Sequence, residues 1–375
     1  MEVKFNPNQL KKARLMRGLS MTELAAKSSL SRESISKYEL GATKPRGESI
    51  LKLANALKFP VYFFGKPDIV IPMGTVFFRS QAASTNKLRE MQKIRLELAA
   101  QSLLYISKYI KLPKLNIPEP LNLKIEKITP EIIQRLASKT RKMWQLGNGP
   151  IKNLTNVMEA NGIIITETTM HSEKMDAVST CINDVPLIAL TDNNESVMRR
   201  RFNLAHELGH ILLHNNVENI FDLNNNKYKN LLEKQANQFA SYFLIPDESF
   251  IDYLVSGSMN FFRQAKLYWN VSIAALIYKA NELHLLSENQ YIYLQKQISK
   301  KHWRKHEPDD NKLPQEHPSI FKTALDMLLD ANLVTKQDLI SVSGLPIEEL
   351  EAIFRTSFIE DNINMSTKPY LRLVK

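Results

Sequence analysis

A chain of 375 residues is long enough for two or three domains, and 43% hydrophobic with 24% charged residues is the composition of a globular protein. Cys181 is the only cysteine, which excludes an internal disulfide, and no apolar run approaches the roughly 18 residues that a membrane span needs. The formal net charge of +11 favours an anionic partner. We therefore expect a cytoplasmic protein with no membrane segment, because the N-terminus also lacks the apolar core of a signal peptide.

Residues 1–66 are expected to form a five-helix domain that carries much of the positive charge. Positions 1–65 hold 12 Lys or Arg against 5 Asp or Glu, so most of the surplus lies in the first sixth of the chain. Ser20, followed three residues later by Glu23, predicts a capping box at the start of one short helix, and Ser31 is placed to cap the next. Two short helices joined by a tight turn indicate a helix-turn-helix unit.

Residues 9–64 resemble the phage-repressor-like, or Xre, helix-turn-helix family. The resemblance implies that the helix near residues 31–40 enters the major groove of double-stranded DNA, and the alternative is a helical module used only for protein contacts. Ser29 stands where the family usually has glycine, so a left-handed backbone there would be mildly strained. A homodimer on paired half-sites is also expected. Transferred residue by residue, the base-facing positions are Met21, Arg32, Glu33, Ser34 and Lys37, and the phosphate-facing positions are Lys44 and Arg46.

Residues 67–122 are expected to form a linker, with an extended stretch, a long amphipathic helix from about Lys87 to Tyr109 and a proline-rich boundary. Residues 123–308 are expected to form an α+β domain. A helix is predicted from Pro130 to Met143, and the runs "GIIITET", "DAVSTCIN" and "VPLIALTDN" predict a small sheet. The predicted fold is therefore mainly α with a small β-sheet.

The segment "RFNLAHELGHILLH" places metal-binding residue types on an otherwise apolar helix. His206 and His210 lie one helical turn apart, so both rings leave the same face and can share one ion. Glu207 points about a hundred degrees away, where it can act as general base on a water molecule. This HExxH pattern on a helix predicts a zinc site with Glu207 as the catalytic residue.

The third zinc ligand must come from another element. Glu233 and Asn237 lie one turn apart on the next predicted helix, so Glu233 can complete the ligand set while Asn237 holds a histidine from behind. His214 continues the first helix, but three histidines at this spacing extend too far to close on one ion, so it is expected to pack or to hydrogen bond. The acidic rivals of Glu233 are Glu218, Asp222 and Glu248.

An HExxH helix followed by a helix with a glutamate is the plan of the thermolysin-like, or gluzincin, peptidases, which usually have Asp where this chain has Asn237. Residues from about 128 to 308 resemble the ImmA/IrrE family, through "RRRFNLAHELGHILLH", "EKQANQFASYFLIP", "GPIKNLTNVMEANGIIIT" and "WNVSIAALIYKANELHLL". The resemblance implies a zinc endopeptidase whose protein substrate is a regulatory protein such as a helix-turn-helix repressor.

Three further expectations concern the rest of the chain. Residues 309–375 are expected to form a small helical domain, and the run "KKHWRKHEPDD" a solvated helix end. His171 is a candidate for stabilising the oxyanion, although a solvated loop histidine is the simpler interpretation. The alternative function is a DNA-binding regulator or antitoxin whose peptidase-like domain serves as a sensor or docking surface without turnover.

Overall fold

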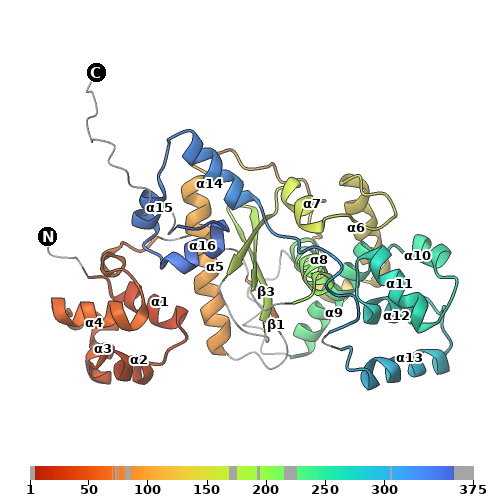
Figure 1. Ribbon diagram of the computed structural model, residues 1–375, viewed down its shortest axis with the longest axis horizontal. Helices are drawn as coiled ribbons and strands as arrows, with labels where there is room; N and C mark the ends of the chain where they lie inside the picture. The colour runs from red at the N-terminus through yellow and green to blue at the C-terminus, as the bar shows by residue number, and fades with distance from the viewer. Residues whose placement is uncertain are drawn as a thin grey trace.

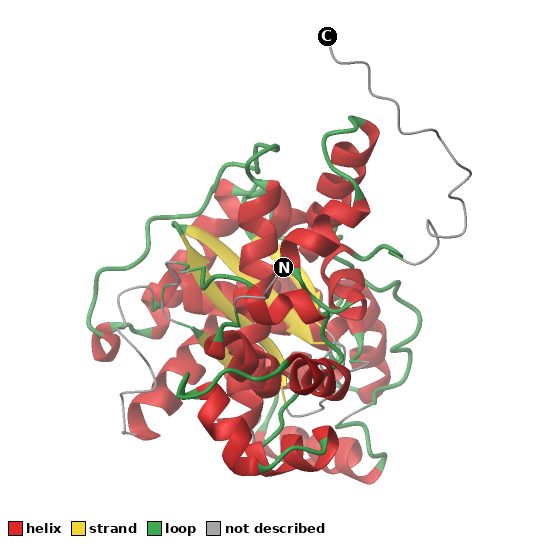
Figure 2. Cartoon of the chain, turned by 90° about the vertical axis from the view of Figure 1, so that its left-hand side faces the viewer, coloured by secondary structure: helices red, strands yellow, loops and turns green. Residues whose placement is uncertain are grey.

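The computed structural model describes residues 5–69, 71, 74, 76–80, 86–168, 175–191, 195–214, 226–304 and 306–358. In this part of the chain, helices surround one four-stranded sheet, which confirms the predicted fold of mainly α with a small β-sheet (Figures 1 and 2). No helix among these residues is long and apolar enough to cross a bilayer. The elements are α1 (Pro7–Met16), α2 (Met21–Ser28), α3 (Arg32–Glu39), α4 (Gly47–Leu57), η1 (Val61–Gly65), β1 (Phe77–Ser80), α5 (Asn86–Ile106), η2 (Ile125–Lys127), α6 (Pro130–Met143), α7 (Leu154–Ala160), β2 (Ile164–Thr168), β3 (Met175–Ile182), β4 (Val185–Thr191), α8 (Val197–Leu213), α9 (Asn226–Leu244), α10 (Asp247–Tyr253), α11 (Met259–Trp269), α12 (Ile273–Glu282), α13 (Glu288–Lys300), α14 (Ile320–Asp330), α15 (Lys336–Ser343) and α16 (Ile347–Phe354).

Local sequence signals set the ends of the N-terminal helices. The side chain of Ser20 accepts a hydrogen bond from the backbone N–H of Glu23 at 3.1 Å, and the Glu23 carboxylate accepts one from the N–H of Ser20 at 2.7 Å, which is the predicted capping box. Ser31 caps α3 by accepting from the N–H of Ser34. Ser29 adopts the left-handed conformation, with a φ of 54°. The fifth helix of this domain is the short 3-10 helix η1.

Helix α5 lies near the middle of the molecule (Figure 1). Buried residues occur on several sides of it, because α1, the sheet and the C-terminal helices all pack against it. They include Ile94, Leu96, Ala99 and Leu103. The amphipathic helix expected in the linker is thus a core helix.

The sheet has the strand order β1-β3-β4-β2. Strands β3 and β4 form an antiparallel hairpin that pairs Ile182 with Val185, and Asn183 and Asp184 turn the chain with φ values of 46° and 65°. β2 pairs with β4 in parallel, and β1 pairs with β3 antiparallel, with Phe77 opposite Ser179. The three predicted strands are present, and β1 is a fourth that comes from the stretch expected only to be extended.

The two faces of the sheet belong to different cores. Alternate residues of a strand point to opposite faces. Ala177, Ile188 and Leu190 pack into the core that contains α8, whereas Val178 and Ala189 pack into the core that contains α5. The sheet therefore separates the helices of the predicted metal site from the N-terminal and C-terminal helices.

Helices α8 and α9 cross at very short range. A Cβ atom placed on Gly209 would lie 3.2 Å from the Cα of Ala236, 3.2 Å from its carbonyl oxygen and 3.2 Å from the Cβ of Phe239. A larger residue at position 209 would require these neighbours to shift by a few tenths of an ångström, so glycine favours the close approach. The crossing brings the side chains of α9 within reach of the histidines on α8.

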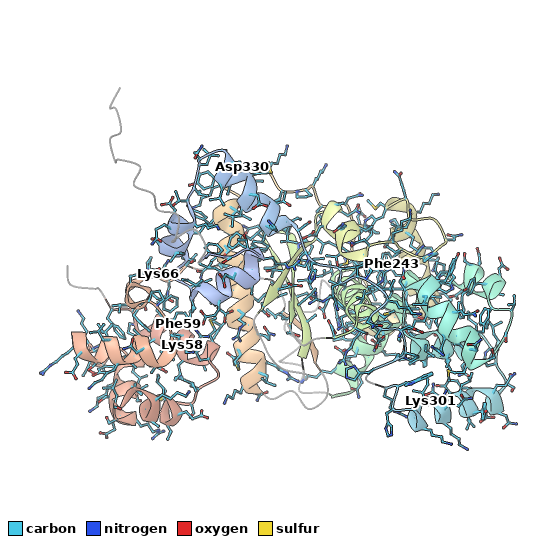
Figure 3. All side chains as sticks on the ribbon, in the orientation of Figure 1. Lys58, Phe59, Lys66, Phe243, Lys301 and Asp330 are labelled. Carbon is cyan, nitrogen blue, oxygen red and sulfur yellow. The ribbon has the colours of Figure 1, made fainter. Side chains whose placement is uncertain are left out.

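The C-terminal helices pack on α5 and share its core with the N-terminal domain. Arg17 donates to Glu348 on α16 at 3.0 Å and to the carbonyl oxygen of Lys58 at 3.2 Å. Its guanidinium lies 5.4 Å from the ring centre of Phe59. Figure 3 labels Lys58, Phe59 and Lys66 on the part of the N-terminal domain that lies toward these helices. Lys66 donates to the carbonyl oxygen of Val342.

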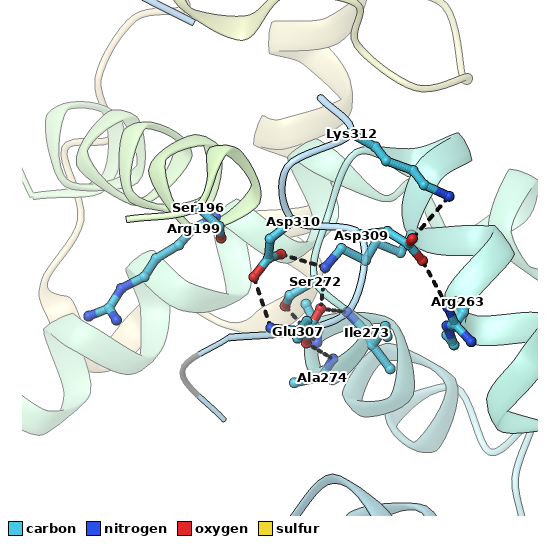
Figure 4. A network of polar contacts seen from close by, with 12 residues as sticks. Ser196, Arg199, Arg263, Ser272, Ile273, Ala274, Glu307, Asp309, Asp310 and Lys312 are labelled. Carbon is cyan, nitrogen blue, oxygen red and sulfur yellow. Dashed lines mark hydrogen bonds and ion pairs between the residues drawn. The ribbon is translucent and has the colours of Figure 1, made fainter. Parts of the chain in front are cut away.

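Residues 307–310 are partly buried and anchored, so the expectation of a solvated helix end is wrong for them. Glu307 accepts hydrogen bonds from the N–H groups of Ile273 and Ala274, at 2.8 and 3.0 Å, and so caps α12 (Figure 4). The fully buried ammonium of Lys266 binds Glu307 at 3.0 Å and Asp310 at 2.5 Å. A buried lysine needs such partners, which explains why this acidic segment folds back onto α11 and α12.

Candidate metal centre

His206, His210 and Glu233 converge between α8 and α9. The Nε2 atoms of the two histidines lie 3.0 Å apart, and Glu233 Oε2 and Oε1 lie 3.3 and 3.6 Å from Nε2 of His206 and of His210. Both rings are buried, and one ligand atom from each of the three residues lies within 4.8 Å of the others. In the described part of the chain, this is the single group of three or more such residues close enough to hold an ion.

The hydrogen-bond partner of His206 determines the tautomer of this histidine, and therefore whether the nitrogen that faces the cluster carries a proton. Nδ1 of His206 lies 2.9 Å from Oδ1 of Asn237, an oxygen that can only accept a hydrogen bond. Nδ1 therefore carries the proton and Nε2 carries the lone pair. This is the tautomer in which Nε2 can coordinate a metal.

A second chain of hydrogen bonds determines the tautomer of His210. Gln235 uses its amide nitrogen to donate to the carbonyl oxygens of Ile125 and Ile128, at 2.8 and 3.1 Å, so its oxygen faces Nε2 of His214 at 3.0 Å. Burial lowers the pKa of His214 to about 3, so the ring is neutral and has a single N–H. That N–H donates to Gln235, and Nδ1 of His214 accepts from Nδ1 of His210 at 2.9 Å.

The donor set fits a divalent metal ion. Two unprotonated imidazole nitrogens at 3.0 Å repel each other unless a cation lies beside both, and the carboxylate of Glu233 adds the negative charge that such a cation requires. Two imidazoles with one carboxylate are a ligand set that suits zinc.

Glu207 contacts the sheet. Its side chain is fully buried, and its carboxylate accepts a hydrogen bond from the hydroxyl of Ser179 on β3. Ser179 has the same strand orientation as Ala177, which packs on the α8 side. Sequence reasoning missed Ser179, because only the packing of β3 on α8 brings the two residues together.

Of the other candidates, those within the described residues are not part of the cluster. Glu248 lies on α10 with an exposed side chain, and His214 contacts His210 from behind. Glu218, Asp222 and His171 lie outside the described residues. The cluster therefore contains His206, His210 and Glu233, the three residues that the sequence spacing predicted. The contact of Gln235 with His214 was not predicted.

Met21 begins α2, the predicted residues from Arg32 to Lys37 lie on α3, and Lys44 and Arg46 lie in the connection to α4. Helix α1 contacts α5 (Figure 1). The side chain of Glu39 at the end of α3 is held by Arg14 through two bonds of 2.6 and 2.8 Å, which fixes α3 on α1. Ser34 is engaged with Ser31 at 2.9 Å. The exposed members of the predicted set are Arg32, Glu33, Lys37, Lys44 and Arg46, and Met21 and Ser34 are half-buried.

Comparison with known families agrees with both parts of the chain. Residues 10–64 match the helix-turn-helix family model, and residues 158–281 match the peptidase family model described as the IrrE N-terminal-like domain. The second match includes α8 and α9 and therefore the whole metal cluster. No curated protein matches this sequence significantly. The chain thus joins a region similar to the helix-turn-helix family to a region similar to the IrrE N-terminal-like domain.

Proposed function

We propose that the protein is a zinc-dependent endopeptidase that cleaves a regulatory protein, such as an Xre-type repressor, and that its N-terminal domain binds DNA. The observation that carries the proposal is the convergence of His206, His210 and Glu233 on α8 and α9, with Glu207 on the same helix as both histidines. A metallopeptidase of the HExxH type needs a bound Lewis acid and a general base beside it, and this arrangement provides residues for both.

Each residue of the site has a separate role in the proposed reaction. Zinc, when bound, polarises the peptide carbonyl and lowers the pKa of a water molecule to about 7. His206, His210 and Glu233 would hold the ion. Glu207 accepts the proton of the attacking water on its carboxylate and later donates it to the leaving amine nitrogen. Ser179 restricts the rotation of that carboxylate by its hydrogen bond.

The N-terminal domain supports double-stranded DNA as a partner. Its exposed basic residues Arg32, Lys37, Lys44 and Arg46 suit a major groove flanked by phosphates. Binding as a homodimer to two half-sites belongs to the same proposal. A peptidase held near an operator would meet a repressor bound there, which favours a DNA-binding protein as the substrate.

The direct test of turnover is incubation of the zinc-loaded protein with candidate repressors encoded beside it, followed by gel electrophoresis and mass spectrometry of the fragments. We expect a defined cleavage, and we expect the Glu207→Gln protein to keep its zinc but to cleave at least about 100-fold more slowly, because an amide cannot accept the proton. Equal cleavage by zinc-loaded Glu207→Gln would remove Glu207 as the base. Zinc binding without cleavage of any repressor would favour the sensor or docking role instead.

A further inference from the structure

The end of α13 and the turn after it carry a second concentration of positive charge. Residues 296–306 contain five Lys or Arg and no Asp or Glu. The whole chain has a formal charge of +11, of which residues 1–65 hold +7 and residues 296–306 hold +5, so all the other residues together sum to −1. The second basic segment lies outside both regions that match known families.

The outward face of α13 carries part of this charge. Leu294 and Ile298 are the buried residues of the helix, and positions 293, 296 and 300 lie on the opposite side, since they repeat at one and two helical turns. Tyr293, Lys296 and Lys300 are exposed there. The helix has one acidic residue, in its first turn. Neither lysine therefore has a carboxylate of its own helix within two turns.

The turn after α13 holds two more basic residues beside this face. The backbone N–H of Trp303 donates to the carbonyl oxygen of Ile298 at 3.0 Å, and its ring packs against the core that contains α8. The ammonium of Lys301 lies 4.5 Å from the centre of that ring. Arg304 donates to the hydroxyl of Ser299 at 3.0 Å. The turn is thus anchored, and Lys301 and Arg304 are both exposed on it.

DNA phosphates fit this set of side chains. Lys, Arg and Tyr provide many of the hydrogen bonds that proteins make to the DNA backbone. Figure 1 shows α13 on the lower side of the molecule, as α3 is, but toward the other end of the long axis. Both basic segments therefore lie on one side. A repressor, the proposed protein substrate, needs basic residues for its own DNA contacts and suits a basic surface less well.

We propose that Tyr293, Lys296, Lys300, Lys301 and Arg304, the α13 surface, form a second DNA-binding surface that contacts phosphates of the duplex beyond the part bound by α3. The proposal goes beyond the proposed function, because it assigns a DNA contact outside the helix-turn-helix region. It rests on that function only for the position of the duplex at α3. Because the surface contacts the backbone, it adds affinity without preference for a base sequence.

The test measures binding of the full-length protein to random-sequence duplexes of about 12 and about 40 base pairs, by fluorescence anisotropy over a series of salt concentrations. The variant combines Lys296→Gln, Lys300→Gln and Lys301→Gln. On the long duplex, its slope of log K against log salt should be smaller than that of the wild type by about 2–3, since each lost phosphate contact removes ~0.9. The short duplex spans about 40 Å, too little to reach both surfaces, so the slope should change less there.

The control combines Lys108→Gln, Lys111→Gln and Lys114→Gln, which removes the same charge from three exposed lysines between α5 and η2. We expect it to keep the wild-type slope on both duplexes. An unchanged slope of the α13 variant on the long duplex, or an equal decrease in the control, would show that the α13 surface does not contact DNA.

Two further measurements separate the alternatives. If the α13 variant binds DNA as the wild type does but loses binding to polyglutamate, the surface belongs to an acidic protein partner and the proposal is wrong. Combined Arg32→Ala and Lys37→Ala should weaken binding to the short duplex. If they do not, while the α13 variant still lowers the slope on the long duplex, the assignment of DNA contact to α3 fails and the α13 surface stands.

Discussion

Two different hydrogen-bond acceptors lie behind the two histidines of the cluster. His206 is held by the amide oxygen of Asn237, whereas His210 is held by the neutral ring of His214, which Gln235 orients in turn. Both acceptors keep the proton on Nδ1 and leave Nε2 to face Glu233. Neither acceptor carries a charge, so both orient the imidazoles without raising their basicity as an aspartate would.

Replacement of His214 tests this arrangement. We expect His214→Ala to weaken zinc binding by about 10- to 100-fold, the usual effect of losing a residue that orients a ligand, without abolishing it. Competition with a chromogenic chelator measures the affinity. His306→Ala, the same change at an exposed histidine, is the control. Wild-type affinity in His214→Ala would show that the histidine chain has no part in holding the metal.

At the scale of elements, the crossing of α8 and α9 positions the site. Each helix contributes residues one turn apart, and the absence of a side chain at Gly209 lets the two backbones approach. The Ala236 backbone lies against that position, one turn from Glu233. The geometry of the cluster therefore depends on a contact that contains no metal ligand.

Gly209→Val should separate the two helices. The added side chain meets the backbone of Ala236, which cannot turn away, so we expect the free energy of unfolding to fall by about 1–3 kcal/mol. Zinc affinity should fall as well, because Glu233 moves with α9. Gly47→Val is the matched control, since no atom lies within 4 Å of the added Cβ, and should change stability by less than about 0.5 kcal/mol. Undiminished stability and zinc affinity in Gly209→Val would contradict this role of the crossing.

Helix α3 is the element on which the DNA proposal depends. Arg32 is exposed at its first turn, so Arg32→Ala should cost about 1–3 kcal/mol of binding on a specific operator and relax the preference for one base. Fluorescence anisotropy with operator and scrambled duplexes measures both effects. Lys52→Ala, on α4 and paired with Glu48 at 2.7 Å, should bind nearly as the wild type does. Operator binding that is unaffected by Arg32→Ala would place the interface elsewhere.

At the scale of the whole molecule, the elements fall into those that the sequence predicts from local patterns and those that depend on distant partners. Helix α6 and the predicted strands follow from periodicity and turn residues within short windows. His206, His210, Glu233 and Asn237 could be selected because each pair repeats at one helical turn. Strand β1 and the burial of α5 could not be predicted, because both depend on partners far away in the chain. The positions of Ser179 and Gln235 beside the site depend on tertiary packing in the same way.

The zinc content of the purified full-length protein tests the central claim most directly. We expect one zinc per chain in the wild type and in Glu248→Ala, which removes an exposed carboxylate on the following helix. Glu233→Ala should lose the metal, because removing one of three protein ligands costs far more affinity than the ~10–100-fold loss expected for Asn237→Ala. Mass spectrometry of the metal, with calorimetric titration of the zinc-free proteins, gives both quantities. A Glu233→Ala protein that retains one tightly bound zinc would contradict the account.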